Sequence, residues 1–427
     1  MRPARASTPC RHNRGWPRSR SPVRILSLAH RFPYPPTFGS KVRAFNVIRH
    51  LARDHQVTVL SLARSADEER EADGIAPFCH EHRAFRVHNV LQAAKIAATL
   101  PTPVSASEAF FHSAALQREI DRQLARRSFD FIFANCSAVG RYVEHVNDLP
   151  KLMDFCDVDS RKWSDYVAFK PWPLSLGYRW EAWRMASAES RMAGRFDHVT
   201  VATKGEVDAL AEIGVRERVD WFPNGVDAEF FKPSSEPFDA NLISFVGRMD
   251  YFPNEQCMVE FCAGAWPLLR RARPALRLQI VGAAPTARVL ALGRIEGVTV
   301  TGSVPDVRPF VQRSALTIAP LKIARGTQNK ILESMAMQVP VIASRIAADG
   351  VDAVPGEHLV VANSADEVCE AVLRVAGDTV ERARLGQAGR ARVLSHHAWP
   401  SAMERLDGIM ERSARPAGGL RAEALTA

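Results

Sequence analysis

The chain has 427 residues, 46% of them hydrophobic and 24% charged, and a formal net charge of +9 at pH 7. This length exceeds what one hydrophobic core usually serves, so we expect two globular domains. No apolar run approaches the roughly 20 residues that a membrane-spanning helix needs, which argues against an integral membrane protein.

The positive charge is concentrated at the N-terminus. Residues 1–24 hold seven arginines and no acid, and without them the net charge falls to about +2. A body with so little net charge argues against binding to nucleic acid. The arginine-rich stretch has no apolar segment of the kind found in a signal peptide, so we expect a disordered basic tail over 1–22. A polybasic membrane contact, or residues upstream of the true start, are the alternatives.

Short apolar strands then alternate with helical stretches. In the first half we expect a helix at 40–54 and strands at 23–28, 57–63, 129–134, 151–155, 198–202 and 219–222. This alternation predicts an α/β domain over 23–222, with a parallel sheet covered by helices on both faces. A linker over 223–241 follows, because that stretch is rich in Pro, Asn, Gly, Asp and Ser.

The alternation restarts after the linker and predicts a second Rossmann-like domain over 242–394. We expect strands at 242–246, 276–281, 298–301, 316–319, 340–343 and 358–361, and helices at 255–271, 330–337, 365–376, 380–394 and 399–410. Residues 412–427 have the small-residue composition of a disordered tail.

The cysteines and histidines give no sign of a metal or disulfide site. The seven cysteines are scattered and contain no CxxC pair, which favours a reducing cytoplasm. His80-Glu81-His82 places two potential ligands close together but offers no third ligand nearby. We therefore expect neither a metal nor another cofactor.

Three strand-to-helix junctions carry residues suited to a phosphorylated ligand, which in open parallel sheets binds at the carboxyl ends of the strands. After the first strand, Gly39 lets the backbone approach a ligand at the next helix N-terminus. The alternative is a loop that only turns the chain. In "SFVGRMD", Gly247 and Arg248 end the first strand of the second domain, and the planar fork of arginine suits a diphosphate. An interdomain salt bridge to an acid is the alternative for Arg248.

The third junction is "GTQNKILESMAMQVPVIAS", residues 326–344. Lys330 and Glu333 share one helix face, while Ile331, Leu332 and Met335 face elsewhere. The lysine suits phosphates near the helix N-terminus, and the glutamate can accept both hydroxyls of a ribose. The alternative is an ordinary surface ion pair. Together with Arg248 and the two-domain layout, the pattern favours a nucleotide-diphosphate site, and no P-loop or GxGxxG motif points elsewhere.

These stretches occur in the order typical of a known family. "PNGVD" (223–227), "FVGRMD" (245–250), "VTGSVPDV" (300–307) and "KILESMAMQVPVIAS" (330–344) make the second half resemble the retaining family 4, or group 1, glycosyltransferases of the GT-B fold. "HRFPYPPTFGSKVRAFNVIRHLA" and "MDFCDVDSRKWSDYV" in the first half resemble the branch associated with exopolysaccharide and PEP-CTERM/exosortase gene clusters. The resemblance implies two Rossmann-like domains facing a cleft, with a helix at 395–411 crossing back to the first domain.

The resemblance also implies roles for individual residues. Arg248 and Lys330 would bind the diphosphate of a nucleotide-sugar donor, and Glu333 would hold the ribose. Gly39 would lie under the phosphates and the acceptor, while the turn at Val304 would meet the base through backbone groups. Transfer would be metal-independent and would retain the anomeric configuration. The family resemblance adds Gly247 to the donor site, and Asp157 as a candidate to orient the transferred sugar or the acceptor.

The chain departs from the family pattern at two positions. Arg325 stands where the family has a first glutamate that touches the donor sugar. Arg325 is therefore our candidate sugar contact, and the backbone of Gly326, Thr327, Gln328 and Asn329 is expected to bind the donor. The usual lysine after "GR" is replaced in "GRMDYFPN", and Lys330 is expected to compensate for it.

The acceptor is expected to bind near an aromatic segment. Residues 162–185 interleave aromatic and basic side chains: Trp163, Trp172, Trp180, Trp183, Lys170, Arg179 and Arg184. Such a mixture suits a membrane interface or a polyprenyl-diphosphate-linked acceptor, and predicts a cytoplasmic protein with peripheral membrane contact. Alternatively, Trp180 and Trp183 belong to the core.

Three functions remain open from the sequence. The first is a glycosyltransferase acting on a sugar or lipid-linked acceptor in exopolysaccharide or glycolipid synthesis. The second is a nucleotide-sugar epimerase on the same fold, which would need no acceptor. The third is a catalytically weak GT-B scaffold that binds nucleotide sugar, for which Arg325 is the one feature in favour.

Overall fold

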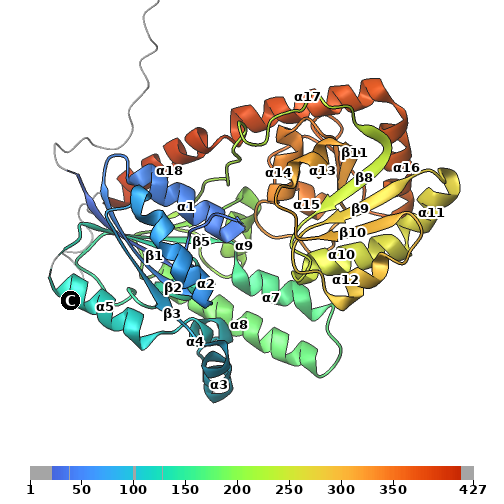
Figure 1. Ribbon diagram of the computed structural model, residues 1–427. Coiled ribbons are helices and arrows are strands. Elements are labelled where there is room, and N and C mark those ends of the chain that lie inside the picture. The colour runs from blue at the N-terminus through green and yellow to red at the C-terminus, as the bar shows by residue number, and fades with distance from the viewer. Residues whose placement is uncertain (1–21, 38, 100–101, 127, 415–427) are drawn as a thin grey trace, which may run out of the picture.

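The computed structural model describes residues 22–37, 39–99, 102–126 and 128–414, and it contains two α/β domains, each built on a parallel sheet (Figure 1). The tail expected over 1–22 lies almost wholly outside the described residues, as does most of the tail expected over 412–427. Residues 412–414 are the end of the last helix.

The first domain has a seven-stranded sheet with the order β3-β2-β1-β4-β5-β6-β7. Its strands are β1 (Arg24–Ala29), β2 (Gln56–Ala63), β3 (Glu81–Arg86), β4 (Phe131–Asn135), β5 (Lys151–Cys156), β6 (His198–Val201) and β7 (Val219–Trp221). The order reverses between β1 and β4, which opens a ligand position at their carboxyl ends. All six expected strands are confirmed. The edge strand β3 was not predicted, because its sequence EHRAFR has no apolar run.

Helices cover both faces of this sheet because successive residues of each strand point to opposite sides. Ile25 and Val57 pack towards α1 (Gly39–Leu51) and α18 (Trp399–Ala414), whereas Leu26 and Leu60 pack towards α5 (Ala114–Ala125) and α8 (Leu174–Ala193). The helical elements of the first domain are α1 (Gly39–Leu51), α2 (Ala66–Arg70), η1 (Glu71–Phe78), α3 (Asn89–Thr99), α4 (Ala106–Phe110), α5 (Ala114–Ala125), α6 (Ser137–Gly140), α7 (Asp159–Val167), α8 (Leu174–Ala193) and α9 (Lys204–Glu212).

The second domain has a six-stranded sheet with the order β10-β9-β8-β11-β12-β13. Its strands are β8 (Asp239–Val246), β9 (Arg277–Val281), β10 (Val298–Gly302), β11 (Ser314–Ala319), β12 (Val341–Ala343) and β13 (Val360–Val361). Its helices are α10 (Phe252–Ala263), α11 (Ala265–Ala272), α12 (Ala287–Leu292), α13 (Arg308–Gln312), α14 (Asn329–Ala336), α15 (Arg345–Ala348), α16 (Ala365–Gly377) and α17 (Thr379–His396). The two Rossmann-like domains of the predicted fold class are thus confirmed.

One predicted helix of the second domain was wrong. The helix expected over 255–271 is two helices, α10 and α11, which meet at Gly264. Glycine is a poor helix former, and Pro267 in the next turn has no N–H to continue the hydrogen-bond ladder. The chain therefore changes direction at this point.

The last helix, α18 (Trp399–Ala414), packs against the first domain, as predicted. Trp399, Met403 and Leu406 are buried in the same core as α1. The crossing segment runs beside the linker, since the Val226 amide donates to the His397 carbonyl at 2.8 Å. Gly225 lies so close to Trp399 that a Cβ there would approach the indole ring to 2.5 Å.

Candidate functional site

Two glycines bring the ends of β8 and β9 into direct contact. A Cβ at Gly282, where φ is +150°, would lie 1.8 Å from the Gly247 carbonyl oxygen. A Cβ at Gly247 would lie 2.6 Å from the Asn254 amide nitrogen and 3.3 Å from Lys330 Nζ. The carboxyl end of β8 therefore presents bare backbone beside an amide and an ammonium group. Sequence reasoning singled out Gly247 but not Gly282, although Gly282 lies in the motif "IVGAAP".

Lys330 lies in the first turn of α14 and reaches the end of β8. Its Nζ donates to the Asn254 side-chain oxygen and lies 4.4 Å from the centre of the Phe245 ring. Asn254 in turn donates to the Arg248 carbonyl at 2.9 Å, so the three residues are tied together. Burial lowers the pKa of Lys330 to about 8.

Glu333 follows one turn later on the same helix. Burial raises the pKa of its carboxyl to about 7, with the charge of Lys330 opposing the shift. Within the described ranges, neither a hydrogen bond nor an ion pair engages this carboxyl, and Lys330 is more than 4.0 Å from it. The surface ion pair considered as an alternative is therefore absent, and the Glu333 oxygens are available to a ligand.

Arg248 forms an ion pair within its own loop. Its Nε and Nη2 donate to the two carboxyl oxygens of Asp250 at 3.0 and 2.6 Å, and this contact lowers the pKa of Asp250. The acid that pairs with Arg248 therefore lies in the same loop, whereas the alternative considered from the sequence was an acid of the other domain. Arg31 of the first domain is near enough for Arg248 to lower its pKa, after burial and the charge of Arg64. Positive charge therefore reaches this region from both domains.

The N-termini of α1 and α14 face each other across the two domains. A Cβ at Gly39 would lie 3.8 Å from the Asn329 side-chain nitrogen. Asn224 of the linker donates to the Asn329 side-chain oxygen at 3.4 Å. Two helix N-termini at one place favour an anionic ligand, because each carries unpaired N–H groups and a partial positive charge.

The loop before α14 rests on acidic side chains of the first domain. A Cβ at Gly326, where φ is +58°, would lie 1.8 Å from Asp157 Oδ1. Burial raises the pKa of Asp157 to about 6 and that of Glu206 to about 7. The charge of Asp157 adds to the upward shift of Glu206, and the charges of neighbouring acids add to the upward shift of Asp157. Glu206 was not predicted as a site residue, because its partners lie far away in the sequence.

The structure places the other predicted donor residues around this loop. Arg325 Nε donates to Asp165 at 2.6 Å, so its side chain points to the first domain. The hydroxyl of Thr327 is buried without a hydrogen-bond partner in the described part of the chain, and Gln328 donates to the Arg325 carbonyl at 2.9 Å. Val304 lies on the loop after β10, two residues beyond Gly302, whose carbonyl accepts a hydrogen bond from the Gly282 amide at 3.2 Å.

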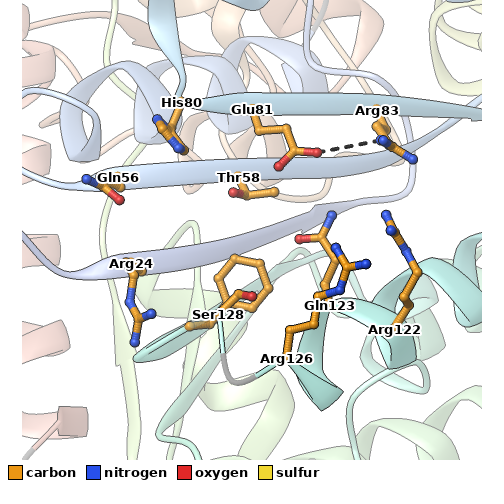
Figure 2. A pocket seen from close by; sticks show the side chains of 11 residues that line it. Arg24, Gln56, Thr58, His80, Glu81, Arg83, Arg122, Gln123, Arg126 and Ser128 are labelled. Atoms are coloured by element: carbon orange, nitrogen blue, oxygen red, sulfur yellow. Dashed lines mark ion pairs between the residues drawn. The ribbon is translucent and has the colours of Figure 1, made fainter.

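A separate hollow of about 420 Å³ lies at the opposite edge of the first sheet (Figure 2). Arg24, Arg83 and Arg122 line it near the amino ends of β1, β2 and β3. These arginines are paired with nearby acids, Arg24 with Asp130 and the other two with Glu119. The hollow is therefore distinct from the site at the carboxyl ends of the strands, and its charges are largely balanced.

The α7–α8 segment exposes a group of large apolar side chains. Trp172, Trp180 and Trp183 are 79%, 45% and 54% exposed, and Trp180 and Trp183 stack at 4.9 Å. We call these three, with the exposed Leu174 and Leu176, the tryptophan patch. The core alternative for Trp180 and Trp183 is thus wrong.

Two of the basic residues expected beside these aromatics have other contacts. Arg184 is buried and forms an ion pair with Glu181 at 2.9 Å, so it does not contribute to the surface. Lys170 lies 4.0 Å from the centre of the Phe252 ring. Arg179 is exposed. In the part of the chain that the structure describes, no helix is long and apolar enough to cross a membrane.

Comparisons with known families match both domains. Residues 38–225 match the family described as "Glycosyl transferase 4-like domain", and residues 240–378 match the family described as "Glycosyl transferases group 1". A curated relative from Corynebacterium glutamicum, the GDP-mannose-dependent monoacylated alpha-(1-6)-phosphatidylinositol monomannoside mannosyltransferase, is 27% identical over 223 residues. That match covers 47% of this chain and 58% of the relative, so it spans little more than half of the relative's length.

Solved structures match nearly the whole fold. Sucrose-phosphate synthase from Thermosynechococcus elongatus superposes with a TM-score of 0.69 at 17% identity, over 91% of this chain and 98% of that chain. HepE of Anabaena in complex with UDP and glucose superposes with a TM-score of 0.67 at 14% identity, over 91% of this chain and 99% of that chain. At these identities the likeness establishes the fold, which is GT-B.

Proposed function

We propose that this chain transfers a sugar from a nucleoside-diphosphate sugar to a hydroxyl acceptor with retention of configuration, because its first domain matches the family described as "Glycosyl transferase 4-like domain" and its second domain matches "Glycosyl transferases group 1". The observation that carries this proposal is the position of Lys330 beside the bare backbone of Gly247, with Glu333 one turn further along α14. A cation, an acceptor-only carboxylate and an open helix N-terminus match a diphosphate and a ribose.

The departure of the nucleoside diphosphate is the step that these residues assist. As the glycosidic bond breaks, negative charge grows on the diphosphate, and Lys330 and the N-terminus of α14 stabilise it. Arg248 joins them by exchanging Asp250 for phosphate oxygens, since both side chains are about half exposed. Glu333 accepts the ribose hydroxyls and fixes the nucleotide. The Val304 loop meets the base through its backbone.

The sugar reacts as an oxocarbenium-like species, which the acceptor hydroxyl attacks from the face that the diphosphate leaves. Asp157 is our candidate to orient the sugar or the acceptor, because it lies against Gly326 at the start of the donor loop. Side chains and helix termini supply the charge stabilisation in this scheme, so we expect turnover to persist in the presence of a chelator.

The donor assignment is tested by thermal unfolding with UDP-, GDP-, ADP- and dTDP-sugars. A ligand that binds only the native state raises the unfolding temperature, and at about 100 times its Kd the gain is about 2.7 kcal/mol. We expect one nucleotide to stabilise the wild type and the gain to disappear in Glu333→Ala. Glu370→Ala, on the exposed face of α16, is the matched control and should respond like the wild type.

Each outcome of this assay separates the candidate functions. A gain that persists in Glu333→Ala would remove Glu333 from the donor site. Stabilisation without transfer to any acceptor would favour the weak scaffold, and a changed sugar in the absence of acceptor would favour the epimerase.

For the acceptor, we propose a lipid-linked sugar, such as a polyprenyl-diphosphate-linked one, reached at the cytoplasmic face of the membrane during exopolysaccharide or glycolipid synthesis. The tryptophan patch supports this, because exposed tryptophans suit the membrane interface. The name of the Corynebacterium relative, which specifies a phosphatidylinositol-based acceptor, also agrees with it.

Membrane contact is tested by co-sedimentation with vesicles of neutral and mixed neutral–anionic phospholipid. We expect the wild type to sediment and Trp172→Ser/Trp183→Ser to remain in the supernatant. Leu290→Ser removes an apolar side chain with 54% exposure from the second domain and should sediment like the wild type. Equal sedimentation of all three proteins would contradict a role for the patch.

A further inference from the structure

Arg325 joins the donor loop of the second domain to two helices of the first. Its Nε donates to Asp165 of α7 at 2.6 Å, and its Nη1 lies 3.9 Å from Glu206 of α9. The side chains of Arg325 and Asp165 are only 17% and 23% exposed, and that of Glu206 is 4% exposed. These contacts are therefore partly shielded from water. An ion pair in such a shielded place is stronger than one on an open surface.

The next residue completes the same junction. Gly326 has no side chain to separate its backbone from Asp157, and its backbone lies near enough to Glu206 to lower the pKa of that carboxyl, against the larger effect of burial. Glu206 is itself fixed by the Val158 amide at 2.6 Å. The loop that begins α14 thus meets a row of three carboxylates, Asp157, Asp165 and Glu206, all from the first domain.

We propose that Arg325 is a positioning residue that fastens the donor loop to the first domain and holds the two domains in their closed arrangement. In that arrangement the N-terminus of α14 faces Gly39, and Lys330 lies where the diphosphate leaves. Arg325 acts through Asp165 and Glu206 and does not touch the donor sugar. The sugar is left to the backbone of 326–329 and to the unpartnered hydroxyl of Thr327.

The physical consequence is a protein that is already closed before the donor binds. Domain closure usually has to be driven by ligand binding energy, and a preformed ionic contact reduces that requirement. The nucleotide itself contacts the second domain and should bind with or without the contact. Loss of Arg325 should therefore affect turnover much more than nucleotide affinity.

The test is a double-mutant cycle with a charge swap. The variants are Arg325→Ala, Asp165→Ala, the double alanine variant, and Arg325→Asp/Asp165→Arg. Three quantities are measured: kcat for transfer, the inhibition constant of the free nucleoside diphosphate, and the radius of gyration by small-angle X-ray scattering without ligand. Arg345→Ala, an exposed arginine of α15 outside the junction, is the matched control.

We expect each single alanine variant to lose about tenfold in kcat and the double variant to lose no more than either, because a contact can be broken only once. The inhibition constant of the nucleoside diphosphate should stay within about twofold of the wild-type value, because the nucleotide contacts the second domain and not the Arg325–Asp165 pair. The radius of gyration should rise in all three alanine variants and return in the charge swap.

Three results would overturn the proposal. A silent Asp165→Ala beside an impaired Arg325→Ala would assign Arg325 to the donor instead. Additive losses would show that the two residues act separately, and an unchanged radius of gyration in all variants would remove the link to closure. The kinetic part rests on the proposed transferase activity. If the wild type transfers no sugar, the radius of gyration of the four variants still decides whether Arg325 closes the domains.

Discussion

Replacement of Lys330 by alanine is expected to lower kcat/KM by about 10²- to 10³-fold, the usual loss when one group that stabilises a developing anion is removed. Lys330 is suited to that task because its ammonium lies beside Gly247 and pairs with an amide rather than an acid. The measurement is initial-rate transfer from the donor identified by thermal unfolding. The fold should persist, since Lys330 is only partly buried and its loss leaves no charged partner behind.

A matched control lies on the loop that precedes the donor loop. Lys322 is 64% exposed and pairs with Glu260 at 3.0 Å, so Lys322→Ala removes the same charge from the same domain. We expect its kcat/KM to remain near the wild-type value. Equal losses in the two variants would mean that the overall charge of the domain matters and that Lys330 has no special position.

The pH profile gives a second measure of the same group. Lys330 must be protonated to stabilise the diphosphate, and its pKa is lowered to about 8, so kcat/KM should fall above about pH 8. Glu333 accepts ribose hydroxyls best as a carboxylate, and its pKa is raised to about 7, so kcat/KM should also fall below about pH 7. Lys330→Arg keeps the charge at high pH and should remove the alkaline limb.

The predictable part of the site is the part that lies within one stretch of sequence. Lys330 and Glu333 share a face of α14 because of helical spacing alone, and Gly247 ends a strand that an apolar run makes evident. The contacts of Arg325 depend instead on the packing of one domain against the other. Asp165 is 160 positions away in the chain, and local pattern carries no information about such a distance.

The same limit applies to the fold. Buried strands such as β2 were predicted because they form apolar runs, whereas β3 carries charged side chains on both faces and was missed. The exposure of Trp180 and Trp183 was left open because helical spacing alone does not say which face of α8 packs on the sheet. The structure answers this through Met185 and Met192, which are buried on the other side of that helix.

The largest effect on stability is expected at Arg43 of α1. Its side chain is 1% exposed, and its Nε and Nη2 donate to the carboxyl of Asp154, which is 0% exposed, at 2.7 and 3.0 Å. Arg43→Met leaves that buried carboxylate without its cation, which typically costs about 3–5 kcal/mol of unfolding free energy. Urea unfolding of the first domain measures this loss of unfolding free energy.

Arg24 supplies the comparison that identifies burial as the cause. It also binds an acid with two donors, reaching Asp130 at 3.0 and 2.7 Å, but both side chains are 45% exposed. Arg24→Met should therefore change the unfolding free energy only slightly, because water replaces the lost partner. A similar loss in the two methionine variants would contradict the explanation.

A third variant separates the unpaired charge from lost packing around the guanidinium, which also stacks on Phe222 at 3.6 Å. Arg43→Met/Asp154→Asn removes both charges and should recover part of the stability that Arg43→Met loses, because no buried carboxylate remains. The same arginine donates to Asn224 at 2.9 Å, and Asn224 donates to Asn329 at the start of α14. The buried pair thereby also supports the position of the donor loop, so nucleotide binding should weaken in Arg43→Met before the first domain unfolds.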